Sequence, residues 1–362
     1  MKSTKILILI LVVLIILAGG ILGYKIIQGK KNEITNVPIK TSEENEVLSV
    51  PLEKKKVQIF QGNDRPIAFM IDNHKDAWPQ AGLNKAYMVY EIIVEGGETR
   101  LMALFKGVNL DKIGPIRSAR HYFIDYVMEN DAIYTHFGWS PLAKSDISSF
   151  DIDNINGIVE SSSTFWRVKD KNSPHNAVTS TEAILKVAKE KKYRTTSEKK
   201  SVLNYVTDEV NLDDGQSATV VSIPYSTLQY VDYEYDKENK VYKRYARNIP
   251  QKDWDTGNSI VTKNIIITFC DNYTLDDVEK KGRQGLKNIG TFDGYYITNG
   301  RAIKIKCIKD ARNLQTKYED LNGNEIKVND GNTWVNICPK NSNVKIQGDE
   351  TENTNTINDS EV

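Results

Sequence analysis

The stretch Ile113-Gly-Pro-Ile-Arg-Ser-Ala-Arg-His121 carries the strongest structural signal in this chain of 362 residues. Its glycine and proline favour a turn, and proline has a backbone angle preset for the first position of a helix. Apolar residues then recur at helical spacing, which predicts a helix over Pro115–Glu129. Arg117 and Arg120 would lie on its first turns, where unpaired N–H groups and the helix dipole favour an anion. The stretch therefore predicts a charged site at the start of a helix.

Polar side chains recur around this stretch, and all four histidines of the chain lie in the same region. An arginine guanidinium binds a carboxylate or phosphate through two parallel hydrogen bonds, and histidine titrates near neutral pH. One interpretation is a site for an anionic ligand. The other is an internal network in which the arginines pair with the protein's own carboxylates. The candidate site residues are Asp72, Asn73, Glu91, Glu95, Arg100, Arg117, Arg120, His136, Arg167 and His175.

Strand-like runs and helical periods alternate loosely on both sides of the stretch. They predict an α+β or α/β domain over residues 59–195. Two glycines in Glu95-Gly-Gly-Glu98 indicate a hairpin turn between two of the strands. The other expected elements are strands at Pro66–Ile71, Met88–Val94, Leu101–Phe105 and Ala132–Phe137, and a closing helix at Thr181–Lys192.

After a linker at residues 196–217, a mainly β domain is predicted over residues 218–340. Three widely spaced cysteines without a CxxC pair argue against a disulfide framework and a zinc site, and they predict buried free thiols at Cys270, Cys307 and Cys338. The expected strands are Val220–Ile223, Tyr230–Tyr235, Val241–Tyr245, Asn264–Phe269, Ala302–Ile308 and Thr333–Ile337.

The first 29 residues are predicted to be a membrane anchor. Ile6–Tyr24 is an uncharged apolar run long enough to cross a hydrocarbon core of about 30 Å. The alternative is a cleaved signal peptide, although the run exceeds the usual length of a signal hydrophobic region. Lysines on both flanks leave the charge rule for orientation nearly silent. Residues 30–58 are predicted to be a flexible tether, and residues 341–362 a disordered tail.

Several function classes are excluded by what the sequence lacks. The 48 basic residues are balanced by 48 acidic ones, so nucleic acid is not an expected partner. The phosphate-binding glycine motifs, the nucleophile elbow and the HExxH and HxxxH spacings are all absent. No cofactor and no metal are therefore expected. His136 and His175 remain candidates for acid–base groups, and no reaction is assigned.

Several separate motifs occur in the order found in one known protein group. They include Pro79-Gln-Ala-Gly-Leu83, Ile113–Arg120 and Pro174-His-Asn176, and Gly331-Asn-Thr-Trp334 lies far downstream. On these motifs the chain, over about residues 60–340, resembles the YerB-like family of bacterial envelope lipoproteins, which have two consecutive domains of unknown function. The resemblance implies an extracytoplasmic envelope protein, a partner of the cell-wall synthesis machinery, without an assigned reaction.

Two departures from the family pattern stand out. Trp139 stands where the family has a second glycine after the residue that matches His136, which would narrow or cover a pocket. In Leu17-Ala-Gly-Gly20 the sequence is similar to a lipoprotein signal, but it lacks the cysteine that carries the lipid. A membrane helix is therefore expected in place of the lipid.

The leading hypothesis is a single-pass membrane protein with its domains outside the cytoplasm. Its arginine-rich site would bind an anionic envelope ligand or a protein partner in the cell envelope. The first alternative is a hydrolase or transferase acting on a cell-wall polymer through His136 or His175. The second is a structural scaffold, in which the clustered polar groups face one another.

Overall fold

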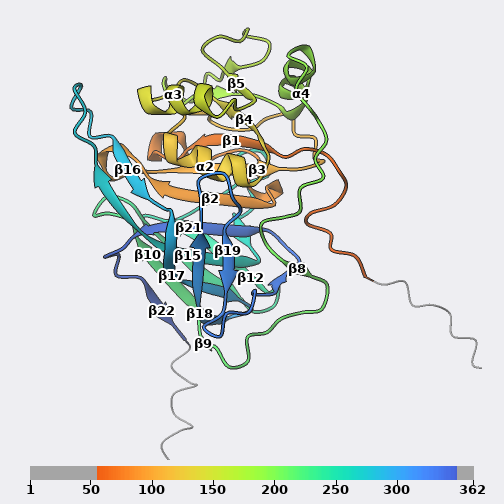
Figure 1. The fold of residues 1–362 in the computed structure, drawn as a ribbon, viewed down its shortest axis with the longest axis vertical. Helices are drawn as coiled ribbons and strands as arrows, with labels where there is room; N and C mark the ends of the chain where they lie inside the picture. The colour runs from red at the N-terminus through yellow and green to blue at the C-terminus, as the bar shows by residue number, and fades with distance from the viewer. Residues whose placement is uncertain (1–54, 349–362) are drawn as a thin grey trace, which may run out of the picture. The chain divides into compact units, whose positions relative to one another are not determined.

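A computed structural model describes residues 55–348 of the chain, which are mainly β-structure (Figure 1). The predicted membrane anchor at residues 1–29 lies outside the described residues. Within residues 55–348, no helix has the length and apolar character needed to cross a membrane. The described α-helices are α2 (His121–Glu129), α3 (Pro141–Ser149) and α4 (Thr181–Glu190).

A mixed sheet of 12 strands combines strands from both predicted domains. Strand β2 pairs in parallel with β21, from Met88 opposite Thr333 to Ile92 opposite Ile337. The sheet therefore continues across the boundary that the sequence predicts at residues 196–217. In sheet order its main strands are β19 (Lys317–Glu319), β18 (Arg301–Lys309), β17 (Gly290–Thr298), β15 (Asn264–Thr274), β21 (Thr333–Pro339), β2 (Met88–Ile93), β3 (Thr99–Phe105), β1 (Ile67–Asp72), β4 (Ile133–His136) and β5 (Asn154–Asn156). Strand β16 (Gln284–Lys287) pairs with β15, and β9 (Gln216–Ser217) with β18.

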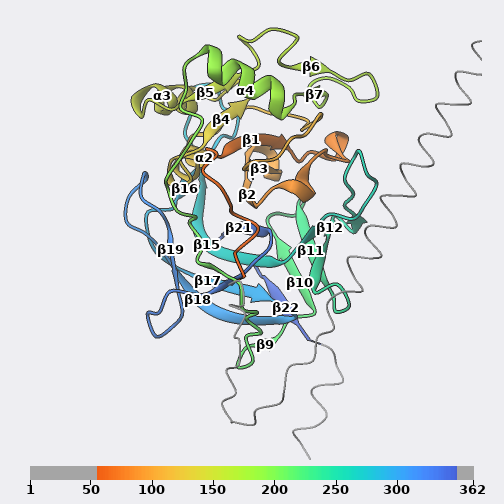
Figure 2. The same ribbon diagram turned by 90° about the vertical axis from the view of Figure 1, so that its right-hand side faces the viewer.

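A second sheet has six strands, all from the C-terminal half (Figure 2). Its last strand, β22, lies within the predicted disordered tail, where pairing with β10 holds residues 345–347 in extended form. Its strands are β13 (Ile249–Pro250), β12 (Val241–Ala246), β11 (Tyr230–Asp236), β10 (Val220–Pro224), β22 (Lys345–Gln347) and β14 (Val261–Thr262). Two short pairs complete the described strands: β20 (Val328–Asn329) with β8 (Tyr205–Val206), and β6 (Trp166–Arg167) with β7 (Ala177–Val178).

The larger sheet is covered on both faces, which is why β1 reads as a continuous apolar run. Phe69 and Ile71 belong to a core shared with the six-stranded sheet and α4. Ala68 and Met70 point into a second core on the other face, shared with α2 and α3. Successive residues of a strand face opposite sides, so one short segment contributes to both cores.

A buried ion pair joins the two sheets. Arg244 on β12 donates from Nη2 to Glu91 Oε2 on β2 at 2.8 Å, and both side chains are at most 1% exposed. Burial alone would lower the pKa of Arg244, but Glu91 and Tyr233 raise it above its ordinary value. The guanidinium also lies 4.5 Å from the ring centroid of Trp334. Glu91 from the N-terminal half of the chain and Arg244 from the C-terminal half thus neutralise each other's charge.

The opposite face of the large sheet has an equivalent pair. Lys309 Nζ donates to Glu129 Oε2 at 2.7 Å, with side chains 2% and 0% exposed. Tyr90 donates to the other carboxylate oxygen at 2.6 Å, and Thr316 donates to Oε2 at 2.7 Å. Both oxygens of Glu129 thereby accept hydrogen bonds within the protein, as a buried carboxylate requires.

The prediction of a helix from Pro115 is wrong, because α2 begins only at His121. Residues 113–119 are extended instead, and their backbone groups bond to neighbouring segments. Ile116 N–H donates to Ala177 O, and Arg117 N–H to Met70 O. These tertiary hydrogen bonds replace the local helical ones. Arg117 and Arg120 are therefore not on the first turns of a helix.

The strands predicted for both halves are confirmed with shifts of one to a few residues at their ends, and so is the helix at α4. The second half is rich in β-structure, as predicted. The three described α-helices all fall in the predicted N-terminal domain, but they do not alternate regularly with strands as in an α/β fold. Cys270, Cys307 and Cys338 are free and buried, as predicted. The helix α3 and the strands β16 and β17 were not anticipated.

Replacing Arg244 with methionine is expected to lower the free energy of unfolding by about 3–5 kcal/mol, because it leaves Glu91 charged and buried without its cation. Urea denaturation of the purified variant measures the change. Lys317→Met, which removes an exposed partner of Asp310, is the control and should leave the midpoint unchanged. Equal midpoints for Arg244→Met and the wild-type protein would contradict the role given to this pair.

Candidate functional site

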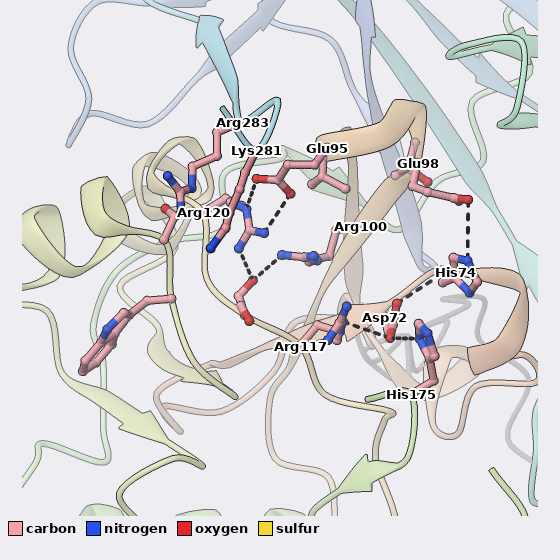
Figure 3. A pocket seen from close by; sticks show the side chains of 15 residues that line it. Asp72, His74, Glu95, Glu98, Arg100, Arg117, Arg120, His175, Lys281 and Arg283 are labelled. Atoms are coloured by element: carbon pink, nitrogen blue, oxygen red, sulfur yellow. Dashed lines mark hydrogen bonds and ion pairs between the residues drawn. The ribbon is translucent and has the colours of Figure 1, made fainter. Parts of the chain in front are cut away.

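A pocket of about 550 Å³ brings together six of the ten predicted site residues (Figure 3). These six are Asp72, Glu95, Arg100, Arg117, Arg120 and His175. The remaining lining residues are His74, Val94, Glu98, Thr99, Ser118, Trp139, Ser140, Lys281 and Arg283. A larger, more apolar groove of about 1060 Å³ runs along α4, and its lining includes none of the ten.

The strand register explains how the pocket forms. Asp72 is the last residue of β1 and lies directly opposite Arg100 on the antiparallel strand β3. The turn between β2 and β3 contains Gly96 and Gly97, with φ of 72° and 74°. Glycine adopts these angles at little cost. The turn thus carries Glu95 to the rim of the pocket beside the arginines.

On one side of the pocket, the carboxylate of Asp72 contacts three neighbouring groups. Its Oδ2 lies 2.8 Å from His175 Nδ1 and 3.1 Å from Arg117 Nε. Its Oδ1 accepts the backbone N–H of His74 at 3.1 Å. Arg117 Nε is buried and close enough for an ion pair, but it is not aligned for a hydrogen bond. Asp72 therefore neutralises the charge of Arg117, but no hydrogen bond from Nε fixes the orientation of the guanidinium.

Glu95 and Arg120 form the opposite side. Arg120 donates from Nε and Nη2 to the two oxygens of Glu95, both at 2.7 Å. Burial alone would raise the pKa of Glu95, but the hydrogen bonds from Arg120 hold it below its ordinary value. The sequence left open an internal network in which the arginines pair with the protein's own carboxylates. Arg120 forms such a pair with Glu95.

Arg100 lies between these two pairs (Figure 3) and has no such partner. It is 6% exposed, and its Nη1 donates to the carbonyl oxygen of Ser118 at 2.5 Å. Among residues 55–348, no carboxylate forms an ion pair with its guanidinium. Burial, and then the charge of Arg120, lower its pKa to about 10. Arg100 is therefore a charged, nearly buried group at neutral pH that lacks a direct counterion.

Two further cations reach the pocket from the C-terminal half. Lys281 and Arg283 lie in the hairpin between β15 and β16, and each pairs with Glu279 at 2.6–2.7 Å. Sequence reasoning missed both, because nothing local links this hairpin to the first half. The only signal was the basic run Lys280-Lys-Gly-Arg283 within an acidic loop.

At one edge of the pocket, His74 stacks on His175 with ring centroids 4.5 Å apart and planes inclined by 17°. His74 also caps the short helix η1 (Lys75–Ala77), where its Nδ1 accepts the N–H of Asp76. With Asp76, the two histidines form a group of metal-ligating residue types in the described part of the chain.

The structure does not bring the other four candidates into the pocket. Asn73 and Glu91 are fully buried, with Asn73 Nδ2 bonded to Glu91 and Thr99. His136 is fully buried, with its ring nitrogens bonded to Gly138 O and Asn154 Oδ1. Arg167 donates to Asn176 at 2.6 Å and is exposed. Their surroundings are those of structural polar groups.

Trp139 is part of the pocket lining, as its bulk beside Gly138 suggested. Its ring centroid lies 5.7 Å from that of His136, which does not line the pocket itself. The side chain places an apolar wall beside an otherwise polar cavity.

The sequence and the overall structure match a defined protein family. The chain belongs to the DUF3048 family: residues 54–194 match its N-terminal domain and residues 221–335 its C-terminal domain, both described as of unknown function. The chain is similar to YerB, a candidate lipoprotein of Bacillus subtilis, with 31% identity over 300 residues, 81% of this chain and 86% of the relative. The crystal structure of YerB superposes with a TM-score of 0.70, covering 78% of this chain and 94% of the other.

Stability should fall in acid partly through His136. Burial lowers its pKa in the folded protein from 6.5 to about 4. Between these values the unfolded chain binds a proton that the folded chain does not, so the free energy of unfolding decreases as pH falls through this window. Urea denaturation at pH 7.0 and 4.5 should show a smaller loss for His136→Gln than for the wild-type protein. An equal loss in both would contradict the buried, neutral state of this histidine.

Proposed function

We propose that this protein is a membrane-anchored, extracytoplasmic protein of the bacterial envelope that binds an anionic ligand in the pocket around Arg100. The envelope location is supported by the similarity to a candidate lipoprotein. The apolar run Ile6–Tyr24 would supply a single-pass anchor in place of a lipid. The folded residues would then lie outside the cytoplasm, on a tether of polar residues.

The observation that carries the binding proposal is the lack of a counterion for Arg100. A buried charge is costly unless it is paired, and the neighbouring carboxylates are already engaged. Asp72 is shared between Arg117 and His175, while both oxygens of Glu95 are taken by Arg120. An anion from solution would provide the missing partner.

The chemistry of the donors favours an oxyanion. Arg100 retains guanidinium donors beyond the one used by Ser118. Arg117 is held only by its ion pair with Asp72. Its guanidinium can therefore rotate and donate hydrogen bonds to the same ligand. Two planar forks suit the oxygens of a phosphate or a carboxylate, which accept parallel hydrogen bonds. The ligand itself would be a cell-envelope molecule or a group on an envelope protein.

Arg100→Gln is expected to weaken binding of inorganic diphosphate or succinate at least tenfold. A hydrogen bond to a charged group contributes about 1.5–3 kcal/mol, and about 1.4 kcal/mol is a factor of ten in affinity. Isothermal titration calorimetry of the full chain in detergent at low salt measures the loss. The two probes distinguish a phosphate site from a carboxylate site.

The matched control is Arg167→Gln, which removes an exposed arginine from the same half of the chain but outside the pocket. It should bind both probes like the wild-type protein. Equal affinities for the wild-type protein and Arg100→Gln, with both folded, would overturn the proposal and leave the pocket as an internal network.

A second candidate function is acid–base catalysis on a cell-wall polymer. It is favoured by the contact between Asp72 and His175, because a carboxylate on Nδ1 orients an imidazole and leaves Nε2 available for proton transfer. Of the two predicted histidines, only His175 lines the pocket. Muropeptide profiling with purified protein tests this function: a product change lost in His175→Ala supports it, and an unchanged profile with wild-type protein removes it.

A further inference from the structure

His74, Asp76 and His175 come together although His175 is far from the other two in the sequence. One ligand atom from each of these residues lies within 4.8 Å of the other two. The absence of HxxxH and HExxH spacings argued against a metal on sequence grounds. Those spacings occur where one helix supplies both ligands, whereas here the turn after β1 and the loop before β7 each supply a histidine.

We infer that these three residues form a binding site for a divalent transition-metal ion of the Zn²⁺ class. Two imidazoles and one carboxylate are the ligand types that Zn²⁺ and its neighbours prefer, whereas Mg²⁺ and Ca²⁺ favour oxygen ligands alone. Three protein ligands leave one coordination position open to solvent or to a small molecule.

His175 is already oriented as a metal ligand. Its Nδ1 is bonded to Asp72 at 2.8 Å, and Asp72 is 4% exposed. A carboxylate on one ring nitrogen fixes the ring and raises the basicity of the other nitrogen, which is the arrangement commonly found behind metal-bound histidines. Nε2 of His175 is then the nitrogen that would bind the ion.

The other two ligands have the freedom to close around an ion. Side chains of His74 and Asp76 are 32% and 58% exposed, and their nearest approach to each other is 3.6 Å. In a tetrahedral site with ligand distances of about 2.0–2.1 Å, neighbouring ligand atoms are about 3.4 Å apart. The ligand atoms now lie within 4.8 Å of one another, so an approach of up to about 1.4 Å, through rotation of the His74 ring out of its stack, would complete the geometry.

The local charges also permit a cation. Arg117 approaches this edge of the pocket, but Asp72 neutralises it. Glu98, 4.0 Å from His74 Nε2, is itself paired with Arg247. Asp76 therefore provides the negative charge that the ion needs. The inference does not depend on the anion proposal, since Arg100 and the metal ligands are different groups. A bound ion would, however, occupy the nitrogen required for acid–base catalysis.

The test uses the full chain in detergent, freed of metal by a chelator that is then removed. Titration with Co²⁺ followed by its visible absorption, and with Zn²⁺ by calorimetry, should show one ion per chain. His74→Ala and Asp72→Asn should each weaken Zn²⁺ binding at least tenfold, the second because it removes the group that orients His175.

His121→Ala is the matched control, because it removes a histidine outside the group and should keep wild-type affinity. Arg100→Gln should also keep it, which separates this result from the fate of the anion proposal. Thermal unfolding establishes that each variant is folded. Absence of a stoichiometric ion in the wild-type protein, or unchanged affinity in folded His74→Ala, would overturn the inference.

Discussion

The parallel pairing of β2 with β21 is the interaction on which the rest of this structure depends. It makes one sheet from two segments at opposite ends of the described chain. The pairing brings Glu91 within reach of Arg244, and the same sheet brings Lys309 to Glu129 on its other face. Each buried charge is costly alone and acceptable in its pair. The segments matched by the two family domains, residues 54–194 and 221–335, therefore share one sheet and its buried ion pairs.

The same constraint shapes the pocket. The β1–β3 register sets Asp72 beside Arg100, while the β15–β16 hairpin of the other segment adds Lys281 and Arg283. Most charges there are paired, as in any stable polar cluster. Arg100 departs from this pattern. Proteins tend to violate local rules at functional sites and to compensate elsewhere, which is why we propose the pocket around Arg100, an arginine without an ion pair within residues 55–348, as the place where a ligand would be held.

Much of this could be predicted from the sequence, and the failures have physical reasons. Strands such as β1 and β2 are long apolar runs with clear boundaries, so they were found. The helix expected from Pro115 was not formed, because backbone partners on β1 and β7 outcompete local hydrogen bonds. Six of the ten candidate residues, predicted from their types and their clustering, line one pocket. Lys281 and Arg283 were missed because only tertiary folding brings their hairpin to the pocket.

The histidines illustrate the same limit. Spacing rules describe ligands on one element, so they could not reveal that His74 and His175 stack. They also gave His136 the same weight as His175, although burial removes it from the pocket. Chemistry carried by residue type is visible in a sequence, whereas exposure and pairing are decided by the fold.

The most direct test of the central claim is a crystal structure of this protein with tungstate, a dianion located by its anomalous scattering. We expect a peak within hydrogen-bond distance of the Arg100 guanidinium, with Arg117 turned toward it. Tungstate bound only elsewhere, with Arg100 paired to one of the protein's own carboxylates, would contradict it.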